Sequence, residues 1–324
     1  MADEHYDCLI VGGGPAGLSA ALNLARARRR VLVIDANRPR NAVTLVSHGF
    51  ITRDGIPPHE LRKLARQELE AYPGAEFQLG TVRRIVGIPL AGAAARPSMG
   101  TEPVSVRYGI EATGVNASPD RSVTASSVLI ASGLRETLPA LPSIRAFYGM
   151  GLFSCIECDG YEQSDRPLAL IGETGDLAAR ALLIAQWSHD LTVFTNGVGT
   201  VTPAQERVLA ERGVRIERRP ISDIVGDRGV VSGILLADGE TVPVEGGFVR
   251  PRWSANLDFA EGLGLDTGVW GLLHTDADGR TNVTGVYAAG DSTAPGPMQL
   301  IVAAGAGART AATINRDLIG VQRQ

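Results

Sequence analysis

The chain has 324 residues, of which 44% are hydrophobic and 20% are charged, and its formal net charge at pH 7 is −4. This length and composition are typical of a globular protein with two domains. It has no Lys/Arg run interleaved with aromatic residues, no apolar stretch of about 20 residues, and no basic and apolar leader at its N-terminus. The sequence therefore gives no support to a nucleic-acid or membrane partner, and we expect a cytoplasmic protein.

The first 35 residues carry the pattern of a dinucleotide-binding site. A predicted strand, Tyr6 to Val11, leads into Gly12-Gly-Gly-Pro-Ala-Gly17, a helical pattern of Ala and Leu, and a second apolar strand that ends at Asp35. Gly12 permits a tight turn, and Gly14 lets the backbone approach a pyrophosphate. Gly17 lets helix and strand pack closely, and Asp35 can bind ribose hydroxyls. The predicted cofactor-binding residues of this segment are Gly12, Gly14, Pro15, Ala16, Gly17 and Asp35.

A polar loop follows and contains Arg40 and His48, which we include among the candidate cofactor-binding residues. His48 could face a bound cofactor, although a loop histidine more often serves only in hydrogen bonding. Pro57-Pro58 then opens a predicted amphipathic helix. Residues 90 to 103 are rich in Ala, Gly and Pro without periodicity, which indicates a hairpin loop or an insertion.

A second predicted cofactor contact is the end of the strand Ser127 to Gly133, which includes Ala131. The strand ends in small residues, as is needed where a chain passes close to a ligand.

Cys155 and Cys158 are two of only three cysteines, and their spacing lets both sulfurs share one helical turn. A structural disulfide is one interpretation, but so small a ring restrains little of the unfolded chain. A structural zinc site needs four ligands, and the only other cysteine is Cys8, alone in an apolar strand pattern. We therefore favour a redox-active pair. Asp159, next in sequence, can give and take the proton that a thiolate lacks.

A second strand-turn-helix-strand pattern runs from Leu168 to Phe194, with its helix expected over Leu177 to Trp187. Because it repeats the arrangement of the N-terminus, the sequence predicts an α/β protein with two doubly wound, nucleotide-binding-type modules. Thr202-Pro-Ala-Gln205 has the form of a capping box and predicts a further helix to about Arg212.

The C-terminal part contains Gly285-Val-Tyr-Ala-Ala-Gly290-Asp291, followed by an Ala/Gly-rich helix pattern to Leu318. Asp291 can reach a ribitol or ribose hydroxyl, and the N-terminus of the helix can hold partial negative charge, as on a reduced flavin ring. The predicted cofactor-binding residues here are Gly290, Asp291, Gln299 and Leu300.

Taken together, these motifs resemble the low-molecular-weight thioredoxin reductases and their relatives. The matching motifs are the N-terminal glycine pattern, Ala131-Ser-Gly133, Cys155-Ile-Glu-Cys158-Asp159-Gly160, and the segment from Gly285 to Asp291 with Gln299. The resemblance implies the class II pyridine nucleotide-disulfide oxidoreductase architecture, with FAD bound by residues 1–137 and 248–324. An inserted NAD(P)-binding-like domain, 138–247, would carry the dithiol. It further implies that Cys158 lies against the flavin, that Cys155 exchanges with substrate, that Asp159 is the acid, and that the protein is a homodimer.

The chain departs from thioredoxin reductases where these bind NADPH. The resemblance leads us to expect a Gly-rich turn and a His-Arg-Arg cluster, but this chain has Gly172-Glu-Thr-Gly-Asp176 and, after the next strand, Thr195-Asn-Gly197. Glu173 would repel a pyrophosphate, and no arginine follows the strand to pair a 2′-phosphate. Relatives with such losses include FAD-dependent dithiol oxidases that act on gliotoxin and holomycin, and enzymes that use ferredoxin. The segment Ser47-His48-Gly49-Phe50 is similar to the dithiol-oxidase branch.

We thus predict an FAD-dependent thiol-disulfide oxidoreductase that cycles Cys155 and Cys158, and favour a dithiol oxidase that uses oxygen and not NADPH. One alternative is a thioredoxin reductase-like enzyme that uses NAD(P)H or ferredoxin. Another is a non-catalytic, redox-sensing flavoprotein. The expected substrate is a small-molecule dithiol or a thioredoxin-like protein.

Overall fold

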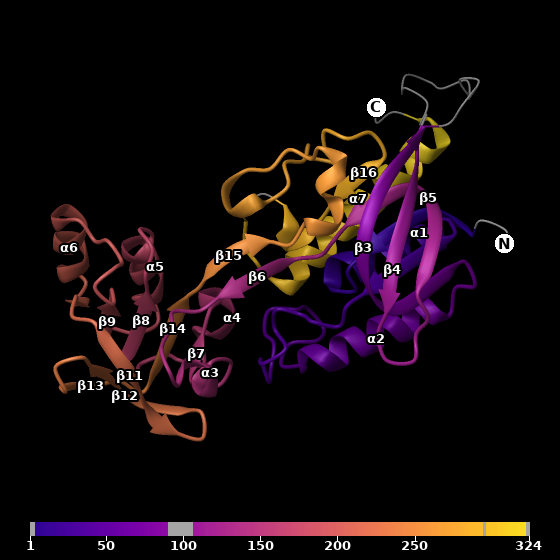
Figure 1. Ribbon diagram of the computed structural model, residues 1–324. Coiled ribbons are helices and arrows are strands. Elements are labelled where there is room, and N and C mark those ends of the chain that lie inside the picture. Colours follow the sequence, from indigo (N-terminus) through magenta and orange to yellow (C-terminus); the bar gives the residue numbers. More distant parts are fainter. Residues whose placement is uncertain (1–3, 90–105, 294–295, 322–324) are drawn as a thin grey trace. The chain divides into compact units, whose positions relative to one another are not determined.

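The computed structural model describes residues 4–89, 106–293 and 296–321 (Figure 1). It divides into two compact units. We call them the first unit (Met1–Ala42, Gly49–Arg135 and Ser254–Gln324) and the disulfide unit (Val43–His48 and Glu136–Trp253). The predicted domains 1–137, 138–247 and 248–324 were assigned by the cofactor each would bind, and that assignment stays a prediction. The loop predicted over 90–103 lies outside the described residues.

The first unit is built on a parallel sheet in which β1 lies between β2 and β5. The start of β3 pairs with β2, and β16 pairs with β5. The remainder of β3 forms an antiparallel layer with β4, and β4 pairs in turn with the start of β5. The strands are β1 (His5–Val11), β2 (Val31–Asp35), β3 (Ala75–Pro89), β4 (Val106–Gly114), β5 (Arg121–Ile130) and β16 (Val286–Ala288).

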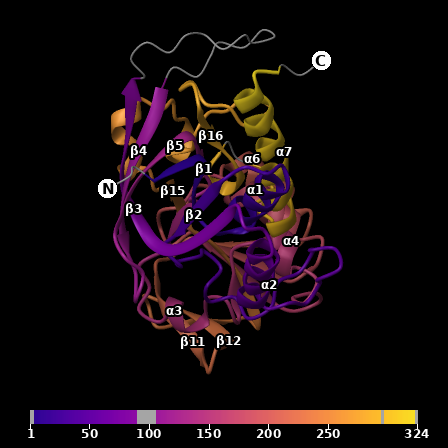
Figure 2. The same cartoon turned by 90° about the vertical axis from the view of Figure 1, so that its right-hand side faces the viewer.

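Two buried clusters cover the faces of this sheet. On one face, apolar side chains of α1 (Pro15–Arg26), α2 (Pro58–Glu70) and α7 (Leu300–Ile319) pack against β1 and β2. On the other face, the antiparallel strands and the 3-10 helix η1 (Asp258–Leu263) enclose the second cluster. Figure 2 shows α1, α2 and α7 on one side of β1 and β2, and β3 and β4 on the other.

The disulfide unit repeats this plan with a five-stranded, wholly parallel sheet in the order β10-β9-β8-β14-β7. These strands are β7 (Leu152–Phe153), β8 (Leu168–Gly172), β9 (Leu191–Phe194), β10 (Arg215–Glu217) and β14 (Gly246–Arg250). Helices α4 (Ile156–Asp159), α5 (Leu177–Ile184) and α6 (Pro203–Ala210) cover one face. The other face packs against α3 (Ile144–Phe147) and the antiparallel strands β11 (Ile221–Asp227), β12 (Val230–Leu236) and β13 (Thr241–Pro243). The chain passes between the units through β6 (Leu134–Thr137) and β15 (Arg252–Ala255), which pair with each other.

The predicted α/β class with two nucleotide-binding-type modules is confirmed, and so is the capping box of α6, in which Thr202 and Gln205 exchange hydrogen bonds. Two helix boundaries were wrong. The first helix, expected over Leu18 to Ala27, is α1 and begins at Pro15, because proline is well suited to the first helical position. Helix α5, expected to reach Trp187, ends at Ile184. In the part of the chain that the structure describes, none of the helices combines the length and hydrophobicity required to span a bilayer.

Candidate functional site

Candidate functional residues occur in both units, and those of each unit are described by themselves. In the first unit, the register of the parallel strands brings three sequence motifs to one edge of the sheet. Val11, the last residue of β1, pairs with Ile34 of β2 and with Ile130 of β5. The residue that follows it, Gly12, therefore lies beside Asp35 and Ala131, which follow those two partners in the chain. Gly12 has a φ of +107°, and a Cβ there would overlap the carbonyl oxygen of Ala131. Glycine is therefore required both by the backbone conformation and by the close approach of β5.

The turn after β1 leaves the N-terminus of α1 open. Gly14 is the N-cap residue, no side chain caps it, and a Cβ at Gly14 would meet nothing within 4 Å. A Cβ at Gly17, by contrast, would overlap the carbonyl oxygen of Gly12, so the helix packs directly on the turn. Pro15 fills the first helical position, where its missing N–H costs nothing. This arrangement of uncapped N–H groups suits a phosphate.

Ala16 lies at the contact between α1 and the C-terminal part of the chain. A Cβ at Gly290 would come within 2.8 Å of the Ala16 Cβ, and one at Gly307 would overlap the Ala16 carbonyl oxygen. The small residues thus hold the segment that contains Asp291 close to the N-terminus of α1.

Asp35 is 9% exposed and accepts a hydrogen bond at 3.0 Å from Arg66 Nη2 on α2. Arg66 in turn stacks on Phe77, with its Cζ 4.2 Å from the ring centroid. Burial lowers the pKa of the nearby Arg62 guanidinium, and the positive charge of Arg66 lowers it as well. The negative charge of Asp35 raises the pKa of Arg62. The carboxylate predicted to bind ribose is therefore held by Arg66, an arginine that the sequence analysis did not single out.

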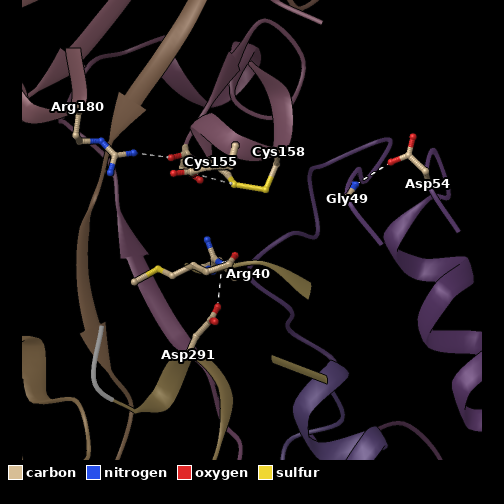
Figure 3. Close-up of a disulfide and its surroundings, with 10 residues drawn as sticks. Arg40, Gly49, Asp54, Cys155, Cys158, Arg180 and Asp291 are labelled. Atoms are coloured by element: carbon tan, nitrogen blue, oxygen red, sulfur yellow. Dashed lines mark hydrogen bonds and ion pairs between the residues drawn. A yellow bond between two sulfur atoms is a disulfide. The ribbon is translucent and has the colours of Figure 1, made fainter. Parts of the chain in front are cut away.

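Arg40 and Asp291 lie 251 residues apart in the sequence and form an ion pair of 2.8 Å (Figure 3). Arg40 Nη2 also donates to the carbonyl oxygen of Met298 at 3.3 Å. Gln299 is the N-cap of α7 and Leu300 its first residue, and no side chain caps this helix end. The structure thus brings Arg40, Asp291 and the N-terminus of α7 together, whereas their contact with a cofactor stays a prediction.

These residues fit a flavin dinucleotide. The open helix end at Gly14, the carboxylate of Asp35 beside Gly13, and the uncapped end of α7 offer groups for a pyrophosphate, a ribose and a flavin ring. A Cβ at Gly13 would lie 2.9 Å from the Asp35 carboxyl group, so the glycines also make the space in which that carboxylate is placed.

In the disulfide unit, Cys155 and Cys158 are joined by a disulfide, with their Cα atoms 5.3 Å apart (Figure 3). Cys155 is the N-cap of α4, and both cysteines are partly exposed. Glu157 Oε2 lies 4.0 Å from Cys155 Sγ. Arg180 on α5 donates from Nη2 to the carbonyl oxygen of Ser154 at 2.9 Å, next to the disulfide. The predicted pairing is thus present, and it leaves the sulfurs accessible for exchange.

Asp159 ends α4 and is partly buried. The pKa of its carboxyl group is raised to about 7, chiefly by burial and also by the charge of Glu162, while the charge of His48 acts in the opposite direction. A group that titrates near neutral pH can both accept and donate a proton, so Asp159 meets the requirement for acid-base chemistry beside a dithiol.

The turn after β8 carries two carboxylates, and each has a partner. Glu173 accepts a hydrogen bond from Asn196 Nδ2 at 2.9 Å and lies 3.3 Å from Arg252 Nη2. Asp176, the N-cap of α5, accepts hydrogen bonds from Thr174 and from Arg250 Nε, the latter at 2.7 Å. The sequence analysis did not foresee the two arginines at this turn, Arg250 and Arg252, which β14 and β15 bring to it.

The residues that the sequence analysis missed are Arg62, Arg66, Glu162, Arg180, Arg250 and Arg252. Arg62 and Arg66 are four residues apart on one helix, a spacing that could have been recognised. Arg250 ends the parallel strand β14, where binding residues gather, and Arg252 begins β15, but the sequence analysis assigned no strand to this segment.

Comparison with known proteins identifies the family of this chain. The family described as pyridine nucleotide-disulphide oxidoreductase matches residues 6–307. The chain belongs to the pyridine nucleotide-disulphide oxidoreductase family. Thioredoxin reductase aclD of Aspergillus oryzae is 30% identical over 302 residues, which cover 90% of each protein. A protein assigned as a thioredoxin reductase in Arthroderma benhamiae is 30% identical over 198 residues, but the match spans only 45% of its length.

Among solved structures of this family, one assigned as thioredoxin reductase TrxB from Bacillus anthracis is 34% identical, with a TM-score of 0.84. The similarity covers 97% of this chain and 98% of that one. The predicted resemblance is therefore confirmed, and the chain is a thioredoxin reductase-like disulfide oxidoreductase of the FAD-dependent type. The alternative of a non-catalytic flavoprotein receives no support from this membership.

Proposed function

We propose that the chain binds FAD in its first unit and uses it to oxidise dithiol substrates, with oxygen as the electron acceptor. Gly12, Gly14, Pro15, Ala16, Gly17 and Asp35 would hold the adenosine diphosphate half, with Ala131 beside them. Arg40, Gly290, Asp291, Gln299 and Leu300 would hold the ribityl and flavin part. When bound, FAD supplies two-electron redox chemistry. The support is the open end of α1 and the glycines that bring these segments together.

The dithiol chemistry takes place at Cys155 and Cys158. A substrate thiol gives its proton to the Asp159 carboxylate, and its sulfur attacks Cys155 Sγ. The disulfide breaks and leaves its electron pair on Cys158 Sγ. The second substrate thiol then attacks the substrate sulfur of the mixed disulfide. The bond to Cys155 Sγ breaks, Cys155 leaves with the electron pair and takes up the proton of that thiol, and the substrate is released as a disulfide. Two electrons and two protons have passed to the cysteine pair and Asp159, and the net reaction with oxygen yields the disulfide and hydrogen peroxide.

One observation favours oxygen over NAD(P)H as the reaction partner. Glu173 and Asp176 place two carboxylates at the N-terminus of α5, where a pyridine nucleotide would bring its phosphates. Arg250 and Arg252 are each engaged with one of these carboxylates. An incoming pyrophosphate would have to displace them and approach two negative charges.

The second candidate is a thioredoxin reductase-like enzyme that takes electrons from NAD(P)H or ferredoxin and reduces a thioredoxin-like protein. It is favoured by the relatives aclD and TrxB, both assigned as thioredoxin reductases. Homodimer formation and a cytoplasmic location remain predictions, and light scattering of the purified protein tests the first of them.

Anaerobic mixing separates the two functions. Purified protein should be yellow with about one FAD per chain, and dithiothreitol should bleach the flavin rapidly while NADPH and NADH do so slowly. Admission of air should restore the colour and release hydrogen peroxide. Rapid bleaching by NADPH would establish the reductase, and slow recovery in air would favour ferredoxin or another protein as electron partner. Colourless protein that takes up no FAD would contradict both.

A further inference from the structure

His48 belongs to the disulfide unit, although the residues directly after it belong to the first unit. Its Nε2 lies 3.5 Å from Oε1 of Glu162. The segment is held there by packing, because a Cβ at Gly149 would come within 2.5 Å of the carbonyl oxygen of Val43, and Ser47 is buried. His48 is thus fixed on the unit that carries the disulfide, more than 100 residues away in the sequence.

Glu162 is placed beside Asp159 by the backbone. The N–H of Gly160 donates to the carbonyl oxygen of Ile156 at 2.8 Å, and the N–H of Gln163 donates to that of Gly160 at 3.2 Å. The chain therefore keeps winding after α4, and residues three apart on such a turn are neighbours. A Cβ at Gly160 would lie 2.8 Å from the Trp187 ring, so this turn is packed firmly against α5 and the segment that follows it.

We propose that His48 and Glu162 are positioning residues of the disulfide site, a pair of opposite charges that controls when Asp159 takes up and releases its proton. The inference rests on the proposed function, in which Asp159 accepts the proton of the substrate thiol. Among the residues that the structure describes, Glu162 and His48 are the charged groups that act on the Asp159 carboxyl. They act in opposite directions, because Glu162 raises its pKa and His48 lowers it. The side chain of Glu162 is 42% exposed and that of His48 is 25% exposed, so a proton can leave the site through them.

Other charged side chains near α4 act at its opposite end. Glu157 is exposed and lies 4.0 Å from Cys155 Sγ, and Arg180 donates to the carbonyl oxygen of Ser154. Substitutions at His48 and Glu162 therefore change the surroundings of Asp159 without removing these contacts of Cys155.

The test is the pH dependence of reduction of the Cys155–Cys158 disulfide by dithiothreitol without oxygen. The reaction is stopped with acid, and the new thiols are alkylated and counted by mass spectrometry, a measurement that does not depend on the flavin. The rate of each variant is divided by the rate of the parent at the same pH. Because the ionisation of dithiothreitol affects both rates equally, it cancels in this ratio. Exposed His189 and Glu211, in the same unit, provide the matched controls His189→Gln and Glu211→Gln.

Opposite shifts are expected. The reduction rate falls at low pH as Asp159 becomes protonated, and we call this part of the pH profile the acid limb. Glu162→Gln should move the acid limb to lower pH by about one unit, with faster reduction than the parent below neutral pH. His48→Gln should move the acid limb up, with slower reduction than the parent below neutral pH, because the variant lacks the charge that lowers the pKa of Asp159. The double variant should lie between the two, and both control variants should give a ratio of one throughout.

A uniform loss at every pH, or no change in either variant, would overturn the role of the pair. Asp159→Asn distinguishes this from failure of the proposed function. If Asp159→Asn loses the acid limb while the pair variants keep the parental profile, only the assignment of His48 and Glu162 fails. If Asp159→Asn itself keeps the limb, Asp159 is not the base, and the proposed chemistry fails with it.

Discussion

Asn196 donates a hydrogen bond from its side-chain nitrogen to Oε1 of Glu173 at 2.9 Å, and so joins the end of β9 to the turn after β8. The same asparagine accepts a hydrogen bond from the N–H of Ile221 at 2.7 Å. Glu173 is therefore held in place at the turn where a dinucleotide-binding module would receive a phosphate.

This relationship predicts the effect of neutralising Glu173. Glu173→Gln keeps an acceptor for Asn196 but removes the negative charge, so NADH and NADPH should both reduce the flavin faster. We expect a gain on the order of tenfold, equivalent to about 1.4 kcal/mol, with no preference between the two nucleotides. Anaerobic stopped-flow absorbance measures it, with Glu211→Gln as the control. An unchanged rate would mean that the charge of Glu173 does not limit nucleotide use.

Asp35→Ala should weaken FAD binding. The substitution removes an acceptor of ribose hydroxyl groups and leaves Arg66 without its carboxylate partner. A charge-assisted hydrogen bond contributes about 1.5 to 3 kcal/mol, so the dissociation constant should rise by roughly ten- to a hundredfold. Titration of the apoprotein with FAD, followed by flavin fluorescence, provides the measurement. Glu68→Ala on the exposed face of α2 should bind FAD as the parent does.

Cys8 should be far less reactive toward alkylating reagents than Cys155 and Cys158. Burial raises the pKa of the Cys8 thiol to about 12, and Cys8 is completely buried in β1. After reduction of the folded protein, iodoacetamide should therefore modify Cys155 and Cys158, which are partly exposed, and leave Cys8 unmodified until denaturant is added. Peptide mapping by mass spectrometry reads this out. Rapid labelling of Cys8 would show that the first unit opens locally.

The two cysteines of the pair should also differ in their effect on the flavin. If Cys158 lies against the flavin, Cys155→Ser leaves a thiolate next to the ring and should produce a long-wavelength charge-transfer absorption band. Cys158→Ser should produce no such band. Absorbance spectra of the two purified variants decide between the roles, and the opposite pattern would exchange them.

Asp159→Asn should change the pH dependence of stability. The carboxyl pKa is about 7 in the folded protein and near 3.8 in the unfolded chain. Folding therefore takes up a proton between these values, and the free energy of unfolding falls as the pH rises through this range. The amide of the variant does not titrate, so the melting temperature of the variant should exceed that of the parent above pH 7 and approach it below pH 4. Calorimetry of the oxidised protein tests this, with exposed Asp227→Asn expected to show no such difference.

Turnover of Asp159→Asn should fall by on the order of a hundredfold or more while the disulfide still forms. Steady-state oxidation of dithiothreitol provides the rate, and thiol counting confirms the disulfide. An unchanged rate would leave Asp159 with only a structural role at the end of α4.

The fold class, the turn after the first strand and the disulfide pair could all be predicted from the amino-acid sequence. Each of these depends on interactions between residues close together in the chain. The glycine pattern is set by backbone geometry over six residues, from Gly12 to Gly17, and Cys155 and Cys158 meet because one helical turn brings them together. The capping box of Thr202 and Gln205 is equally local. Patterns of this kind need no knowledge of the rest of the chain.

The pairing of distant charged residues could not be predicted from the sequence and is set by the packing of the folded chain. Arg252 reaches Glu173, Arg40 reaches Asp291, and His48 reaches Glu162 through strand pairing and packing between segments that are 79 to 251 residues apart. The sequence identified Glu173 as a carboxylate that would repel a pyrophosphate and His48 as a residue that could face a cofactor. It could not show their partners, because a pair of charges distant in the chain leaves no periodic pattern, and its geometry is set by the packing of whole sheets.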